Sequence, residues 1–266
     1  MEKLIMLGTG NAGVVDLYNT CFALKHGQEY ILVDAGGGNR ILKQLQLKNI
    51  SLTDIHYAIV THAHTDHILG MIWIYRMIGS LMVSKKYQGD LTIYCHDEVK
   101  ETLCMMIERM LPLKLQKLLN ERIFIQEVKD HEVIDILGVE TTFLDIASTK
   151  MKQFGFKMKL EKGNFVCLGD EPCAKHLEAE VKDAYFLLHE AFCLYGDREI
   201  YQPYEKHHST VKEASELAQK QNVQNLVLYH TEEHLQEQRK ACYLKEAKQY
   251  FLHNVYVPDD LDEIDL

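Results

Sequence analysis

Five short apolar runs constrain the fold of this chain most, because each is followed within two residues by a polar side chain that can bind a metal. The runs are Tyr30–Val33, Tyr57–Val60, Phe165–Leu168, Tyr185–Leu188 and Leu226–Tyr229. The polar residues that follow them are Asp34, His62, Asp170, His189 with Glu190, and His230. Runs of four β-prone residues indicate buried strands. Since α/β folds place their sites at the carboxyl ends of strands, these residues predict a functional site.

Helix-like stretches alternate with these strands, at residues 39–48, 67–82, 97–119, 173–182, 210–221 and 232–250. The alternation predicts an α/β fold in which helices cover the sheets. No Ser-, Gly- or Pro-rich tract divides the 266 residues. We therefore expect a single domain over residues 1–266.

Composition and charge narrow the class of protein. The apolar run near the N-terminus is only as long as a strand, so we expect no signal peptide, and no apolar stretch is long enough to span a bilayer. Seven scattered cysteines without a C-x-x-C pair favour reduced thiols and a cytoplasmic protein. The formal net charge of −10 disfavours a long nucleic acid as substrate, because phosphate contacts require a basic face.

The stretch Thr61–Gly70, THAHTDHILG, carries the most specific chemistry. His62 and His64 are two residues apart, so in an extended chain they point the same way. Asp66 and His67 follow, and we expect them at a turn before a helix that begins near residue 68. Imidazole and carboxylate groups without cysteine suit zinc, and also iron, manganese or cobalt. The alternative is a histidine-rich surface loop.

This H-x-H-x-D-H pattern after a strand resembles the signature of the metallo-β-lactamase superfamily, and the resemblance covers nearly the whole chain. It implies a four-layer αββα sandwich, the metallo-β-lactamase fold. It also implies that His62 and His64 bind a first metal, and that Asp66 and His67 bind a second. Three further roles follow from it: a carboxylate that bridges the metals, the last histidine of the second metal, and an aspartate that orients a ligand histidine. The residues at these positions are Asp170, His230 and Asp34.

Two more motifs resemble ribonuclease Z-like hydrolases. The stretch Leu187–Phe192, LLHEAF, is similar to that group's H-E-A-T motif, and His207–Ala218, HHSTVKEASELA, is similar to its H-S-T motif before a helix. Asp170 speaks against true β-lactamases, which generally lack a bridging carboxylate there. The resemblance implies that His208 donates a proton to the leaving oxygen at the scissile phosphate, with Glu190 as a candidate to orient it.

The sequence around His208 also has a physical interpretation. Thr210 and Glu213 fit a capping box, so His208 precedes a helix N-terminus, where the helix dipole favours anions. The alternative is that His208 only caps the helix. We expect His207 to be exposed, and His189 to be a buried strand-end histidine rather than a ligand.

The third motif of the group departs from the family pattern. Its histidine should lie a few residues before Phe154, yet the segment Asp145–Gln153 contains none. Thr149 stands nearest the expected place, which leaves that position vacant. The first metal would then have only His62, His64 and Asp170, whereas the second keeps its full set. We therefore expect the second site to fill more tightly. His96 and His131 lie in other elements and are expected at the surface.

Ribonuclease Z proper carries a long arm that grips tRNA, and no such arm is visible between the third motif and Asp170. The resemblance therefore implies a metal-dependent hydrolase of the ribonuclease Z type that cleaves a compact phosphodiester, with Asp66 orienting the attacking hydroxide. One or two divalent ions are expected, zinc first, with manganese or iron as alternatives. Another ester (a sulfate ester or thioester) or a catalytically silent binding protein stays open. The amphipathic stretch Asp97–Leu119 is either a core helix or a homodimer face.

Overall fold

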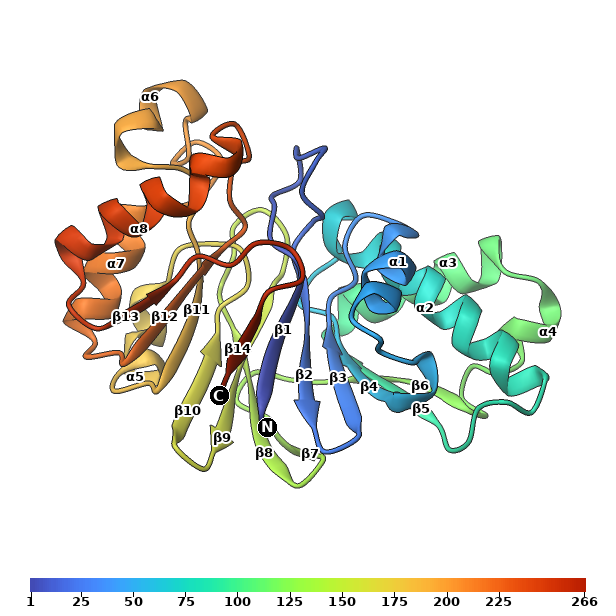
Figure 1. Cartoon of the computed structure of the whole chain (residues 1–266). Coiled ribbons are helices and arrows are strands. Elements are labelled where there is room, and N and C mark those ends of the chain that lie inside the picture. The colour runs from blue at the N-terminus through green and yellow to red at the C-terminus, as the bar shows by residue number, and fades with distance from the viewer. The chain divides into compact units, whose positions relative to one another are not determined.

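The computed structural model describes residues 1–266, which form two compact units (Figure 1). The first unit comprises Met1–Gly8, Tyr18–Lys129 and Asp260–Leu266, and the second comprises Thr9–Leu17 and Asp130–Asp259. Each unit has its own sheet with helices, which confirms the α/β class. The two units interleave along the chain, so no single linker separates them. A single domain over the whole chain stays a prediction.

The sheet of the first unit has seven strands in the order β14-β1-β2-β3-β4-β5-β6. They are β1 (Lys3–Gly8), β2 (Cys21–His26), β3 (Glu29–Val33), β4 (Ile55–Ile59), β5 (Leu91–Cys95), β6 (Ile123–Glu127) and β14 (Glu263–Asp265). The strands β14 to β3 pair antiparallel, and β3 to β6 pair parallel. Because β3 and β4 are parallel neighbours, the residues after Val33 and after Ile59 meet at one edge of the sheet.

The helices of the first unit are α1 (Arg40–Leu47), η1 (Leu52–Asp54), α2 (Thr65–Val83), α3 (Asp97–Met110) and α4 (Leu113–Gln116). Helix α2 buries an apolar stripe that includes Met71, Ile74 and Ile78 in the core of this unit. The stretch 97–119 is interrupted as its proline predicts, since Leu111, the residue before Pro112, has an extended backbone and ends α3.

The sheet of the second unit also has seven strands, in the order β13-β12-β11-β10-β9-β8-β7. They are β7 (Val133–Ile136), β8 (Val139–Asp145), β9 (Phe154–Leu160), β10 (Gly163–Cys167), β11 (Phe186–Glu190), β12 (Asn225–Tyr229) and β13 (Asn254–Tyr256). The strands β7 to β10 pair antiparallel, and β10 to β13 pair parallel. All five apolar runs of the sequence are therefore strands, with ends shifted by one or two residues.

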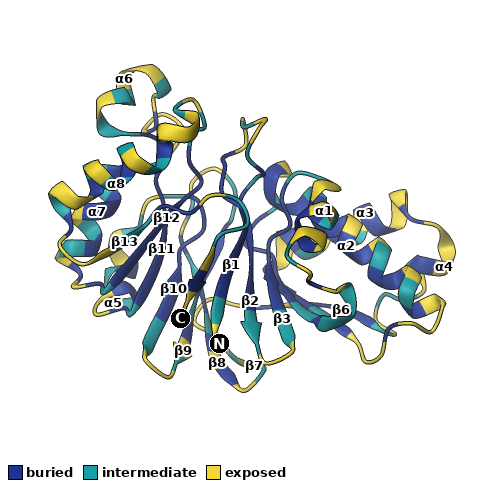
Figure 2. Ribbon diagram, in the orientation of Figure 1, coloured by how far each residue is buried: buried dark blue, intermediate teal, exposed yellow.

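The helical elements of the second unit are η2 (Lys175–Leu177), α5 (Glu178–Val181), η3 (Tyr195–Asp197), α6 (Arg198–Tyr201), α7 (Val211–Lys220), η4 (Gln236–Gln238) and α8 (Arg239–Tyr250). Helices α7 and α8 pack against each other and bury Ala214, Ala218 and Tyr243 in the core of this unit. Figure 2 shows the common pattern: the strands are mostly buried, whereas the outer faces of the helices are exposed. None of the helices has the length and apolar character needed to cross a membrane.

Candidate metal centre

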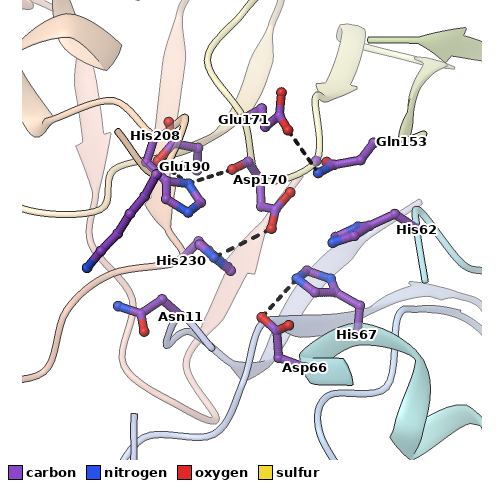
Figure 3. Close-up of polar contacts among 12 residues, drawn as sticks. Asn11, His62, Asp66, His67, Gln153, Asp170, Glu171, Glu190, His208 and His230 are labelled. Carbon is purple, nitrogen blue, oxygen red and sulfur yellow. Dashed lines mark hydrogen bonds and ion pairs between the residues drawn. The ribbon is translucent and has the colours of Figure 1, made fainter. Parts of the chain in front are cut away.

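The four motif residues of the first unit lie between β4 and the first turn of α2. His62 and His64 occupy the loop after β4, and their ring centroids are 4.6 Å apart. Helix α2 begins at Thr65, so Asp66 and His67 lie inside its first turn. The sequence pattern places the start of this helix near residue 68, about one helical turn too late. The ring centroids of His67 and His62 are 4.1 Å apart (Figure 3).

The start of α2 packs closely against the loop after β3, which explains how His67 reaches its place. A Cβ atom added at Gly70 would lie 1.7 Å from the carbonyl oxygen of Ala35, so only glycine fits this contact. Two backbone hydrogen bonds hold the contact: Ala35 N donates to His67 O at 3.0 Å, and Gly70 N donates to Gly36 O at 2.8 Å. The backbone thus fixes His67 relative to the end of β3.

Asp34 directly follows β3, and its carboxylate accepts three hydrogen bonds. The donors are Nδ1 of His67 at 2.8 Å, the backbone N–H of Thr61 at 2.8 Å and the Thr61 hydroxyl at 2.7 Å. Asp34 has a left-handed backbone with φ of 53°. Aspartate tolerates this region better than most residues, and non-glycine residues there often mark functional sites.

The two carboxylates beside His67 dominate its electrostatics. Burial disfavours a charged ring, but Asp66 and Asp34 more than offset it and raise the pKa of His67 well above the usual value. The two carboxylates therefore stabilise the protonated form of the ring. Nε2 of His67 lies 3.4 Å from an Asp66 oxygen (Figure 3). A metal that binds this nitrogen must displace a proton.

In the second unit, Asp170 and His230 follow β10 and β12 and are both buried. Nε2 of His230 lies 3.6 Å from an Asp170 carboxylate oxygen (Figure 3). His230 has a left-handed backbone with φ of 56°, as Asp34 does at the end of β3. The Tyr229 hydroxyl of β12 donates to the carbonyl oxygen of Gly169, which ties the turn before Asp170 to the neighbouring strands.

His208 lies against the same turn. Its Nδ1 hydrogen-bonds to the backbone carbonyl of Asp170 at 2.8 Å, and its ring lies parallel to Phe192, with centroids 4.6 Å apart. The ring centroid of His230 is 5.2 Å away. Thr210 and Glu213 form the expected capping box at the start of α7, so this helix start also fixes the position of His208.

Glu190 does not orient His208 through the hydrogen bond that the sequence suggested. The distance from His208 Nδ1 to Glu190 Oε2 is 3.7 Å, which is too long for a hydrogen bond. The Glu190 carboxyl instead accepts the backbone N–H of Ser209. Burial of the side chain raises the pKa of Glu190 well above the usual value. Glu190 thus supports the backbone next to His208 from the end of β11.

The vacant position of the third motif lies in an exposed segment. Thr149 is exposed, and its hydroxyl hydrogen-bonds to Nδ1 of His207 at 3.1 Å. His207 is exposed as predicted. His96 contradicts its surface assignment, because it is fully buried at the start of α3, whereas His131 is exposed as expected.

Three contact residues escaped the sequence interpretation. Thr61 bonds to Asp34, Phe192 stacks on His208, and Tyr229 holds the Gly169 turn. Each is adjacent in sequence to a predicted site residue or ends a motif, but sequence alone does not tell a contact from simple burial. His189 is buried and hydrogen-bonds through Nδ1 to its neighbour's carbonyl at 2.7 Å, with Nε2 accepting from Cys173 N at 3.3 Å.

Comparison with known proteins identifies a family and several relatives that the chain resembles. The model of the family "Anti-Pycsar protein Apyc1" matches residues 2–254. Ribonuclease Z of Thermococcus sibiricus is 26% identical and aligns over 100% of this chain and 97% of its own length.

Two solved structures share the fold over almost the full length of both chains. The metallo-β-lactamase fold protein YhfI from Bacillus subtilis has a TM-score of 0.81 at 17% identity and covers 100% of this chain and 99% of its own. The short form of human tRNase Z has a TM-score of 0.74 at 20% identity, with 98% of each chain covered. The metallo-β-lactamase fold expected from the sequence is thereby confirmed. The chain belongs to the anti-Pycsar protein Apyc1 family, within the ribonuclease Z-like branch of the metallo-β-lactamase superfamily.

Proposed function

We propose that this protein is a metal-dependent phosphodiesterase that hydrolyses a compact phosphodiester. The observation that carries the proposal is the set of imidazole and carboxylate groups, nearly all of them buried, that lie just after strands or in the first turn of α2. We assign them to two metals that share one carboxylate. Asp66, His67, Asp170 and His230 would hold the second metal, and His62, His64 and Asp170 would hold the first.

The donor chemistry fits divalent ions. Neutral imidazole and carboxylate without thiolate suit zinc, manganese or iron. Asp34 holds Nδ1 of His67, so Nε2 is the nitrogen that the neutral ring offers to a metal. Catalytic zinc sites commonly have three protein ligands and a water, so the set around His62 suffices, but the set of four around His67 should bind more tightly.

Each residue has a distinct part in the hydrolysis. Divalent ions at these ligands would supply a nucleophile at neutral pH, by lowering the pKa of water to about 7, and would polarise the phosphoryl oxygen. Asp66 would orient the attacking water. A protonated His208 would keep Nδ1 on the Asp170 carbonyl and deliver the Nε2 proton to the leaving oxygen.

The connections of the second unit support a compact substrate. Strands β9 and β10 form a hairpin joined at residues 161–162, and residues 146–153 alone join β8 to β9. No long arm is inserted there. The net charge of −10 also disfavours a long RNA. The ribonuclease Z relatives support phosphodiester chemistry, but at 26% identity they do not carry their own substrate over.

A catalytically silent binding protein is the second candidate, and the vacancy at Thr149 favours it. The absence of one histidine from the first ligand set would weaken binding of the first metal and leave binding of the second metal in place. Hydrolysis of a sulfate ester or a thioester would use the same residues and differ only in the substrate.

A substrate panel separates these functions. We would measure turnover of bis-p-nitrophenyl phosphate, a cyclic mononucleotide, a precursor tRNA, an aryl sulfate and a thioester, each with added zinc or manganese. We expect metal-dependent cleavage of the compact phosphodiesters and at least tenfold slower cleavage of the tRNA, a difference of about 1.4 kcal/mol in transition-state stabilisation. Asp66→Asn should abolish the activity, while Glu101→Gln, at an exposed carboxylate of α3, should leave it unchanged. Metal binding without turnover of any substrate would favour the silent protein.

A further inference from the structure

We propose that Thr61 is a positioning residue that extends the control of the Asp34 carboxylate from His67 to His62. A single carboxylate would then decide which ring nitrogen each of the two histidines presents to the metals. The inference rests on the proposed metal centre, since the two histidines belong to different ligand sets there.

The geometry around Asp34 is a branched hydrogen-bond network inside the first unit. One oxygen of Asp34, Oδ2, accepts from both the Thr61 hydroxyl at 2.7 Å and His67 Nδ1 at 2.8 Å. The other oxygen accepts the backbone N–H of Thr61 at 2.8 Å. The Thr61 hydroxyl in turn lies 3.0 Å from Nδ1 of His62. All four residues are at least 97% buried.

The direction of each hydrogen bond follows from proton counting. A hydroxyl has one proton, and a carboxylate can only accept, so the Thr61 proton points to Asp34. The Thr61 oxygen can then only accept from His62. Nδ1 of His62 must therefore carry a proton, and Nε2 keeps the lone pair that a metal requires.

The two histidines differ in how strongly they depend on Thr61. His67 donates directly to Asp34, so loss of the Thr61 hydroxyl leaves its hydrogen bond in place. His62 would lose the Thr61 hydroxyl as the acceptor for Nδ1, which removes the preference for the tautomer with the proton on Nδ1. A hydroxyl deletion at Thr61 should thus weaken the set with His62 and spare the set with His67. A general loss of packing would affect both sets alike.

The isosteric variant Thr61→Val and the conservative variant Thr61→Ser test this difference. Metal affinities would be measured by competition with a chromophoric chelator, and folding by circular dichroism. We expect Thr61→Val to weaken the second equivalent of zinc about tenfold, as outer hydrogen bonds to metal ligands commonly do, and to leave the first equivalent unchanged. Thr61→Ser should restore both affinities. Equal weakening of both equivalents, or no change in either, would overturn the proposal.

Nuclear magnetic resonance of the metal-free protein gives a second, independent readout. With ¹⁵N-labelled histidine at mildly alkaline pH, the wild-type ring of His62 should show a protonated Nδ1 and an unprotonated Nε2. An Nε2-protonated His62 in the wild type would overturn the proposal even if Thr61→Val fails to fold. This readout needs neither metal nor turnover. A protein with the expected ring signals but no hydrolysis would contradict the proposed function and leave the network intact.

Discussion

The backbone carbonyl of Asp170 accepts a hydrogen bond from Nδ1 of His208 at 2.8 Å. The turn that carries a candidate metal ligand therefore also orients the candidate proton donor. Phe192 packs against the His208 ring, since the two rings lie parallel with their centroids 4.6 Å apart. Two contacts of different kinds thus fix the His208 ring with its Nε2 pointing away from the Asp170 carbonyl.

Removal of His208 should slow turnover in a way that depends on the leaving group. General acid catalysis contributes roughly 100-fold or more when the leaving oxygen needs a proton. For His208→Ala we expect a loss of about that size in kcat with an alkyl phosphodiester and a much smaller loss with p-nitrophenyl esters, whose anions leave unaided. Metal affinity should not change. His207→Ala, at the exposed neighbouring histidine, is the matched control.

Limiting metal should fill the set around His67 before the set around His62. The reason is ligand number, since Thr149 leaves the first set with three protein ligands. In a zinc titration, His67→Ala should lower the affinity for the first equivalent. His64→Ala should lower only the affinity for the second equivalent. Anomalous scattering from crystals grown at limiting metal would check the order. Equal occupancy of both positions would contradict it.

Replacement of Glu190 should change how stability depends on pH. Burial raises the pKa of Glu190 in the folded protein, so the folded state binds the carboxyl proton more strongly than the unfolded state. Stability must then fall as pH rises from the unfolded value of about 4.3 towards the folded value. Glu190→Gln keeps an acceptor for Ser209 N–H and removes the charge.

As pH rises through that range, the melting temperature of Glu190→Gln should therefore increase relative to that of the wild type. Differential scanning fluorimetry at several pH values would measure it. A difference that stays constant with pH would show that the Glu190 carboxyl does not change its protonation on folding.

Glu233 should control the order of the segment Thr9–Leu17. Its carboxylate accepts the backbone N–H groups of Val15, Asp16 and Leu17 at 2.7, 3.0 and 2.9 Å. A hydrogen bond to a charged group contributes roughly 1.5 kcal/mol, so Glu233→Ala should speed hydrogen exchange at these amides about tenfold. Glu237→Ala, at a nearby exposed glutamate, should not. Unchanged exchange in both variants would mean that these contacts do not limit the opening of the segment.

The strands and the motif chemistry could be predicted from the sequence because both are local. Apolar runs of four or five residues define β3, β4, β10, β11 and β12, and a capping box defines the start of α7. The start of α2 could not be placed, because its register depends on the contact between Gly70 and Ala35, residues that are far apart in the sequence.

The partners of the polar groups were also beyond the sequence. The hydrogen bond of His208 goes to a backbone carbonyl, which has no sequence signature, rather than to Glu190. The burial of His96 has the same origin, since a histidine at a helix start is exposed or buried according to what packs over it. Sequence patterns report which groups are present, whereas tertiary packing decides which of them meet.

Under the proposed function, bound metal and the Asp170 carboxylate together should support phosphodiester hydrolysis. The most direct test of this expectation is the rate of bis-p-nitrophenyl phosphate hydrolysis by metal-stripped protein as zinc or manganese is added back. We expect no rate without metal, a rate that rises with metal until the sites are filled, and no recovery in Asp170→Asn at the same metal concentration. A rate that is independent of metal, or equal recovery in Asp170→Asn, would contradict it.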